Sequence, residues 1–171
     1  RRTETGLAEH WAVPSVTLVL DPSLEDLSPG ATDAVREGVG AWIASVPGLP
    51  AMSFEVASER AVARRDGKST VVAAPITLPG HEKDLALTTA YADDATGAIL
   101  EADIVFNTDY SYSVIDDVAD SHGQAYDVGA VATHEAGHFF GLGEDYDDTT
   151  TTMYIFTKPR DTHKRTLTSV D

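Results

Sequence analysis

The sequence predicts a single α/β domain, of the mixed α+β kind, built on one twisted and mostly parallel sheet with two long helices. Short β-rich runs alternate with segments in which apolar residues recur at helical spacing. No repeat, low-complexity stretch or Pro/Gly-rich linker interrupts this order. At 171 residues the chain is long enough to bury a core without covalent cross-links. We therefore expect residues 1–171 to form one domain.

The first half of the chain contains three predicted strands and one predicted helix. Residues 16–21 are a β-rich run, residues 52–58 alternate apolar and polar side chains, and residues 70–76 are continuously apolar. Between the first two runs, apolar residues fall at helical spacing until a Pro-Gly pair. The sequence predicts that Ser28 caps this helix and that Pro29 is its first residue.

The sequence of the second half of the chain predicts a β-hairpin and a second helix. Residues 85–106 form two strand-like runs around a turn in which Gly97 is free to take a positive φ. The helix should begin at Asp127 as N-cap and end near Gly141. We expect residues 1–141 to form an N-terminal subdomain and residues 142–171 a small irregular C-terminal one.

Composition excludes several classes of partner. Asp and Glu number 28 against 12 Lys and Arg, which gives a formal charge of −16 and repels phosphate backbones and anionic lipid. No apolar run approaches the roughly 20 residues that span a bilayer. We therefore expect no nucleic-acid or membrane partner, and a monomer. The absence of cysteine excludes disulfides, thiol nucleophiles and thiolate ligands within this chain.

Acidic residues cluster in several loops, for example at residues 93–94, 116–117 and 145–148. These clusters are either solvated surface or calcium ligands. The sequence contains no EF-hand spacing that would favour calcium. Calcium is therefore kept as an additional candidate cofactor.

The chemistry concentrates in the stretch "THEAGHFFGLGEDYDD", residues 133–148. On a helix, His134 and His138 lie on one face with Cβ atoms about 5–6 Å apart, the zinc-ligand spacing of the H-E-x-x-H motif. A hydrolytic zinc site needs three protein ligands and an open fourth position for water. Glu135 follows His134 by about 100° around the helix, where it can act as general base without ligating. An isolated motif of this kind also occurs by chance on polar helix faces.

Gly141, three residues after His138, extends the motif to H-E-x-x-H-x-x-G-x-x-E. Here the sequence resembles the metzincin clan of zinc endopeptidases, whose signature ends in His or Asp and is followed by a methionine-containing turn. Met153 in "TTTTMYIF" is similar to that turn. Together with "VTLVLD", "LTTAYADDATGAILEADIVFN" and "YDVGAVATHEAGHFFGLG", the pattern most resembles the matrixins and their bacterial relatives, over essentially the whole chain.

The resemblance implies one catalytic zinc held by His134, His138 and a third residue. The matrixin third ligand is histidine, whereas the matching position here is Glu144, with Asp145 as the alternative. Met153 would be the floor beneath the metal. The matrixin structural-zinc loop has no counterpart, so no second zinc is expected.

The resemblance also implies that an extended peptide or protein substrate pairs antiparallel with an exposed edge strand, and it assigns this role to Leu85, Leu87, Thr89 and Tyr91. The matrixins act outside the cell. The resemblance therefore implies secretion or export. The opening "RRTETGLAEHW" lacks the apolar core of a signal peptide, so either a leader was removed before this sequence begins or the chain is cytosolic.

The function predicted from the sequence is that of a zinc metalloendopeptidase with Glu135 as general base and then general acid. The alternative is a noncatalytic module that keeps the fold to bind a metal or a protein. Glu135 favours the enzyme, because a binding module has no need of the base.

Overall fold

The structure, a computed structural model that describes residues 1–116 and 123–171, is built on one six-stranded mixed sheet. The strands are β1 (His10–Trp11), β2 (Ser15–Leu20), β3 (Ala51–Val56), β4 (Ser69–Ala74), β5 (Ala86–Ala92) and β6 (Ala98–Asn107). They are ordered β1-β6-β4-β2-β3, and all of these pairs are parallel. The last strand, β5, pairs antiparallel with β6. The prediction of a mixed, mostly parallel sheet is confirmed.

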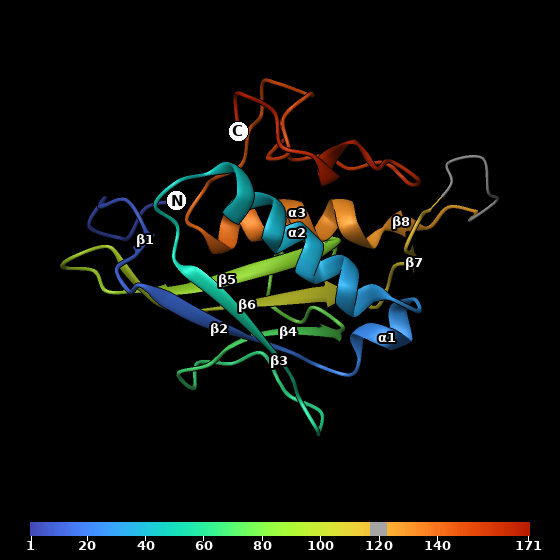
Figure 1. Ribbon diagram of the computed structural model, residues 1–171, viewed down its shortest axis with the longest axis horizontal. Helices are drawn as coiled ribbons and strands as arrows, with labels where there is room; N and C mark the ends of the chain where they lie inside the picture. Colours follow the sequence, from blue (N-terminus) through green and yellow to red (C-terminus); the bar gives the residue numbers. More distant parts are fainter. Residues whose placement is uncertain (117–122) are drawn as a thin grey trace.

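Two helices, α2 (Ala31–Ser45) and α3 (Val128–Phe139), pack side by side on one face of the sheet (Figure 1). The Trp42 indole donates a hydrogen bond of 2.7 Å to the carbonyl of Thr133 and so joins them. A Cβ at Gly38 would lie 2.8 Å from the Thr133 amide nitrogen, so this glycine allows the helices to approach closely.

Four shorter elements complete the described chain: α1 (Leu24–Leu27), β7 (Tyr112–Ser113), β8 (Tyr126–Asp127) and the 3₁₀ turn η1 (His163–Arg165). β7 and β8 pair parallel just before α3. The segment after α3 is irregular except for η1, and it crosses over α3 on the side away from the sheet (Figure 1).

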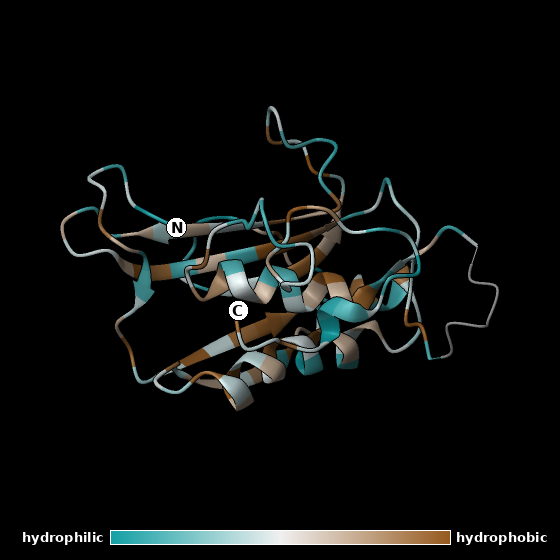
Figure 2. Cartoon of the chain, turned by 90° about the horizontal axis from the view of Figure 1, so that it is seen from above, coloured by the Kyte–Doolittle hydropathy of each residue, from teal (hydrophilic) through white to brown (hydrophobic). Residues whose placement is uncertain are grey.

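The core fills the space between the sheet and the two helices. Its fully buried side chains include Leu18 and Leu20 of β2, Ile104 and Phe106 of β6, and Phe139 of α3. Coloured by hydropathy, the central strands are largely apolar, whereas the outer loops are mostly polar (Figure 2). Burial of this apolar face holds the sheet and helices together.

The start of α2 differs from the prediction. The helix begins at Ala31, with Gly30 at the N-cap in a left-handed conformation and no side-chain cap. Glu25 of α1 instead accepts hydrogen bonds from the amides of Gly30 and Thr32. Ser28 is drawn away from the helix, because its hydroxyl accepts a bond from the amide of Val114. The prediction of a Ser28 cap with Pro29 as first helical residue is therefore wrong.

The second half agrees with the sequence more closely. The hairpin of β5 and β6 turns at Gly97, which has φ of 78°. The N-cap of α3 is Asp127, whose carboxylate accepts a 2.7 Å bond from the amide of Ala130. The buried carboxylate of Asp127 also forms an ion pair with the partly exposed Arg165, so the same side chain caps the helix and anchors the C-terminal segment. Among the described residues, no helix is long and apolar enough to cross a bilayer.

Candidate metal centre

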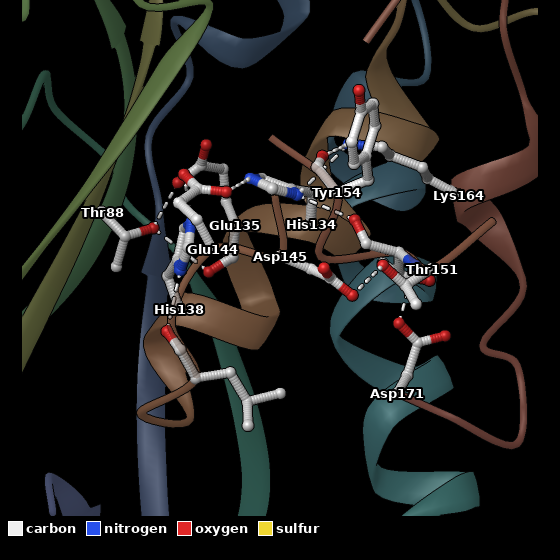
Figure 3. Close-up of polar contacts among 12 residues, drawn as sticks. Thr88, His134, Glu135, His138, Glu144, Asp145, Thr151, Tyr154, Lys164 and Asp171 are labelled. Carbon is white, nitrogen blue, oxygen red and sulfur yellow. Dashed lines mark hydrogen bonds and ion pairs between the residues drawn. The ribbon is translucent and has the colours of Figure 1, made fainter. Parts of the chain in front are cut away.

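Three potential ligands converge beneath the β5 edge of the sheet (Figure 3). His134 and His138 lie on α3 and are 7% and 4% exposed. Glu144 reaches them from the turn after the helix, with its Oε1 3.1 Å from Nε2 of His138 and its Oε2 3.5 Å from Nε2 of His134. One donor atom from each residue lies within 4.8 Å of the other two, so the trio could hold a metal ion.

Backbone carbonyls orient both imidazoles. The Nδ1 of His134 lies 2.8 Å from the carbonyl oxygen of Thr152, and that of His138 lies 2.9 Å from the carbonyl oxygen of Leu142. A carbonyl oxygen only accepts, so each Nδ1 donates to it and each Nε2 faces the centre. This outer hydrogen bond is the arrangement that fixes a metal-ligating histidine.

Each histidine nitrogen lies at a distance from a Glu144 oxygen that is close to the donor spacing of a tetrahedral metal. Ligand bonds of about 2.0–2.1 Å at tetrahedral angles put neighbouring donors about 3.3 Å apart. The two separations between histidine nitrogens and Glu144 oxygens, 3.1 and 3.5 Å, lie on either side of this value. Two imidazole nitrogens facing a carboxylate need a cation or protons between them. The chemistry of the donor set therefore suits a divalent cation.

Gly141 lets the chain bring Glu144 to the histidines. Its φ of 99° lies in the left-handed region, and its amide donates to the carbonyl of His138 as the helix ends. A Cβ at this position would also lie 2.3 Å from the carbonyl oxygen of Glu9. The turn thus requires glycine both for its conformation and for the close approach of the N-terminal segment.

Electrostatics favour an anionic Glu144. Burial raises the pKa of its carboxyl, but hydrogen bonds from His134 and His138 together hold that pKa below its usual range. A buried cation lies behind the site: Lys164 is 1% exposed, donates to the carbonyl of Tyr154, and has its Nζ 3.4 Å from Nδ1 of His134. Burial lowers the pKa of Lys164 to about 8, against the opposing influence of Glu144 and Glu135.

Glu135, the predicted general base, is 5% exposed and lies beside the three ligands. Its Oε2 accepts a 2.6 Å hydrogen bond from the hydroxyl of Thr88 on β5 (Figure 3). The same hydroxyl lies 3.1 Å from the backbone carbonyl oxygen of Glu135. The sequence analysis did not single out Thr88.

Met153 packs against α3 between the turns that carry the two histidines. It is 5% exposed, and a Cβ at Gly137 would lie 2.2 Å from its sulfur and 2.8 Å from the Trp42 ring. The loop that presents Met153 is pinned by backbone bonds from Asp145 to Met153 and from Ile155 to Asp145. Gly137 is the second feature that the sequence analysis missed. A glycine inside a helix costs roughly 1 kcal/mol relative to alanine, and this cost is a signal of close packing.

The alternative ligand Asp145 does not join the trio. Its carboxylate accepts the amides of Asp147 and Asp148 and the hydroxyl of Thr151, within the loop before Met153. Backbone hydrogen bonds from Asp147 and Asp148 lower the pKa of Asp145. Over residues 1–116 and 123–171, the trio is the single group of His, Cys, Asp or Glu side chains that meets metal-site spacing. Calcium stays a prediction from the acidic loops.

The predicted substrate strand lies at the sheet edge. Within the described part of the chain β5 pairs with β6 alone, and the carbonyl of Thr88 on its open edge accepts a 2.8 Å bond from Arg1. Leu85 precedes the strand by one residue. The side chains of Leu87, Thr89 and Tyr91 point away from α3, into a cavity of about 370 Å³ on the opposite face of the sheet. The antiparallel register also turns the main-chain groups of Leu87 and Thr89 toward β6, so the open edge presents the main-chain groups of alternate residues such as Thr88.

Comparison of the chain with protein-family models and with curated proteins finds no match.

Proposed function

We propose that this protein is a zinc-dependent metalloendopeptidase with a metzincin-like catalytic domain of the matrixin kind. The observation that carries the proposal is the convergence of His134, His138 and Glu144 around one point, with the carboxylate of Glu135 buried beside them. The H-E-x-x-H-x-x-G-x-x-E spacing and the methionine packed beneath the helix support it.

In the proposed hydrolysis of a peptide, different residues bind the metal, transfer the proton and bind the substrate. His134, His138 and Glu144 would hold the zinc, which when bound supplies Lewis acidity to polarise the scissile carbonyl and to make a water more acidic. Glu135 would take a proton from the attacking water and deliver it to the leaving amine. The open edge of β5 would bind an extended peptide through main-chain hydrogen bonds, with little demand on sequence.

Zinc, rather than magnesium or calcium, is proposed from the ligand types. Two imidazoles and one carboxylate form the His₂Glu set of catalytic zinc sites, whereas magnesium and calcium prefer oxygen ligands alone. A secreted enzyme is part of the proposal, because an unrestrained endopeptidase would damage the cell that retains it, and the enzyme is proposed to be a monomer.

The test is cleavage of unfolded casein by the zinc-loaded protein. Cleavage should stop on addition of a chelator, return with zinc, and be absent in Glu135→Gln, which keeps the shape of the side chain but cannot take a proton. Zinc content of the variant should equal that of the unmodified protein. One bound zinc without chelator-sensitive cleavage would favour the noncatalytic binding module instead.

A further inference from the structure

Thr88 is the one described residue whose side chain hydrogen-bonds the carboxylate of Glu135. It lies on β5, is 2% exposed, and reaches across from the sheet to the helix. Its backbone is fixed by antiparallel pairing with Ile104 of β6. Because a β-branched side chain has few accessible rotamers, the hydroxyl is held at one place above the helix.

The bond matters because Glu135 is buried. A carboxylate removed from water is strongly destabilised unless donors compensate it, and a hydroxyl bonded to an ionised oxygen is a short, strong donor. The observed separation of 2.6 Å between Thr88 Oγ1 and Glu135 Oε2 lies in that short range. With Oε2 engaged, Oε1 is the oxygen left to receive a proton.

We infer that Thr88 is a positioning residue for Glu135, an inference that rests on the function proposed above. The hydroxyl bonded to Oε2 fixes the plane of the carboxyl group, so that Oε1 stays directed at the attacking water. When Oε1 takes the proton, Oε2 remains an acceptor, and the bond to Thr88 persists until the proton passes to the leaving amine. The reactive oxygen therefore does not rotate between the two proton transfers.

Variants of Thr88 separate positioning from substrate binding. Thr88→Val keeps the shape but removes the donor, and kcat should fall about tenfold, a part of the 10²–10⁴ that proton transfer contributes. KM and zinc content should stay unchanged, and Thr88→Ser should restore most of kcat. The matched control is Thr17→Val, which removes an exposed hydroxyl pair with Ser53 on β3, far from α3.

A second measurement needs no activity. Thr88 Oγ1 also lies near the Glu135 backbone carbonyl, so a merely structural tie between strand and helix would act through that atom. Glu135→Ala removes the carboxylate and keeps the carbonyl. The Tm of the metal-free protein is therefore measured for Thr88→Val, Glu135→Ala and the double variant. If the side-chain bond dominates, Thr88→Val should lower Tm clearly in the presence of Glu135 and much less in its absence.

The outcomes are distinguishable. Equal losses of Tm in both backgrounds, an unchanged kcat in Thr88→Val, or a rise in KM without a fall in kcat would each overturn the role of Thr88. Absence of any chelator-sensitive cleavage by the unmodified protein would instead overturn the proposed function. In that case the Tm cycle still decides whether Thr88 holds the Glu135 carboxylate.

Discussion

In the proposed zinc site, the third ligand is the residue that differs most from the matrixin pattern. Glu144 places a carboxylate where a matrixin has an imidazole, and its oxygens lie 3.1 and 3.5 Å from the two histidine nitrogens. An anionic ligand lowers the net charge of the site by one. The buried ammonium of Lys164 behind His134 partly offsets that change.

Substitutions at residues 144 and 145 test this assignment. Glu144→Ala should weaken zinc binding about 100-fold or more, since even the loss of a residue that only orients a ligand costs 10–100-fold. Asp145→Ala should keep the metal but lower Tm, because it loses the bonds that shape the loop before Met153. Zinc titration with a competing chelator measures the first effect, and thermal unfolding the second. A reversed pattern, with zinc lost from Asp145→Ala and kept by Glu144→Ala, would show that Asp145 is the ligand.

Several site residues could be read from the sequence because their positions are local. The i, i+4 histidines need only a helix, and the glycine at residue 141 needs only a turn. Thr88 could not be found in this way, because its contact with Glu135 depends on which face of β5 meets α3. The sequence analysis assigned the alternate residues Leu87, Thr89 and Tyr91, whose side chains face the other way. Lys164 is a lone lysine in polar sequence, and nothing local signals its burial.

At the scale of elements, α3 carries two of the three candidate metal ligands and is buried along its whole length. Every residue from Val128 to Phe139 is buried, between the sheet and α2 on one side and the C-terminal segment on the other. Small residues make this packing feasible. Gly137 leaves room for Met153, and Gly38 of α2 leaves room for the backbone of Thr133.

Two glycine substitutions in helices should have opposite effects. Gly137→Ala would put a Cβ 2.2 Å from the Met153 sulfur and should destabilise the protein by about 1–3 kcal/mol. Gly40→Ala, in α2, meets nothing within 4 Å and should stabilise by up to about 1 kcal/mol through helix propensity. Urea unfolding of the metal-free proteins measures both changes. Similar stability of the two variants would mean that Met153 does not pack against α3 in this way.

The first residue of a helix could be predicted where a nearby side chain in the sequence caps the helix. Asp127 caps α3 as its sequence position indicates. The start of α2 was not predictable, because Ser28 is held by Val114, which is remote in sequence. The order of the strands likewise depends on pairing between segments that are distant in sequence. The alternation of apolar and polar residues within one strand does not indicate its neighbours.

At the scale of the whole molecule, the two long helices cover one face of the sheet, and loops of the described chain cover part of the other (Figure 1). Asp103 points to this second face, is 2% exposed, and uses one oxygen to accept the amide of Thr70. Its other oxygen, Oδ2, has no hydrogen bond of standard geometry, although the amide of Arg64 lies near enough to lower the pKa. Burial raises the pKa of Asp103 to about 7, and the charges of Glu101 and Asp66 act in the same direction.

The raised pKa of Asp103 makes the folded protein less stable as pH rises. The folded-state pKa of Asp103 lies above the value of 3.8 expected of an unfolded chain, so the folded protein binds the proton more tightly. Ionisation of Asp103 should therefore cost stability as pH rises from about 4 to 7. Asp103→Asn should gain on the order of 2 kcal/mol relative to the unmodified protein at pH 8 and nothing near pH 4.

Urea unfolding at a series of pH values checks this prediction, with the exposed Asp94→Asn as control. The difference in free energy of unfolding between variant and unmodified protein should grow between about pH 4 and 7, and level off above that range, for Asp103→Asn alone. A difference that is constant across pH would show that Asp103 titrates normally.

The position of all three ligands between residues 134 and 144 has a consequence for folding kinetics. Because loop-closure entropy grows with chain length, ligands this near in sequence can meet on a metal before any strand has paired. Chelation by the unfolded chain would offset the unfavourable nucleation of α3, and it would also reduce the net stabilisation that the metal gives the folded state. Zinc added during refolding should therefore accelerate folding more than it slows unfolding, and stopped-flow measurements in both directions would resolve the two rates.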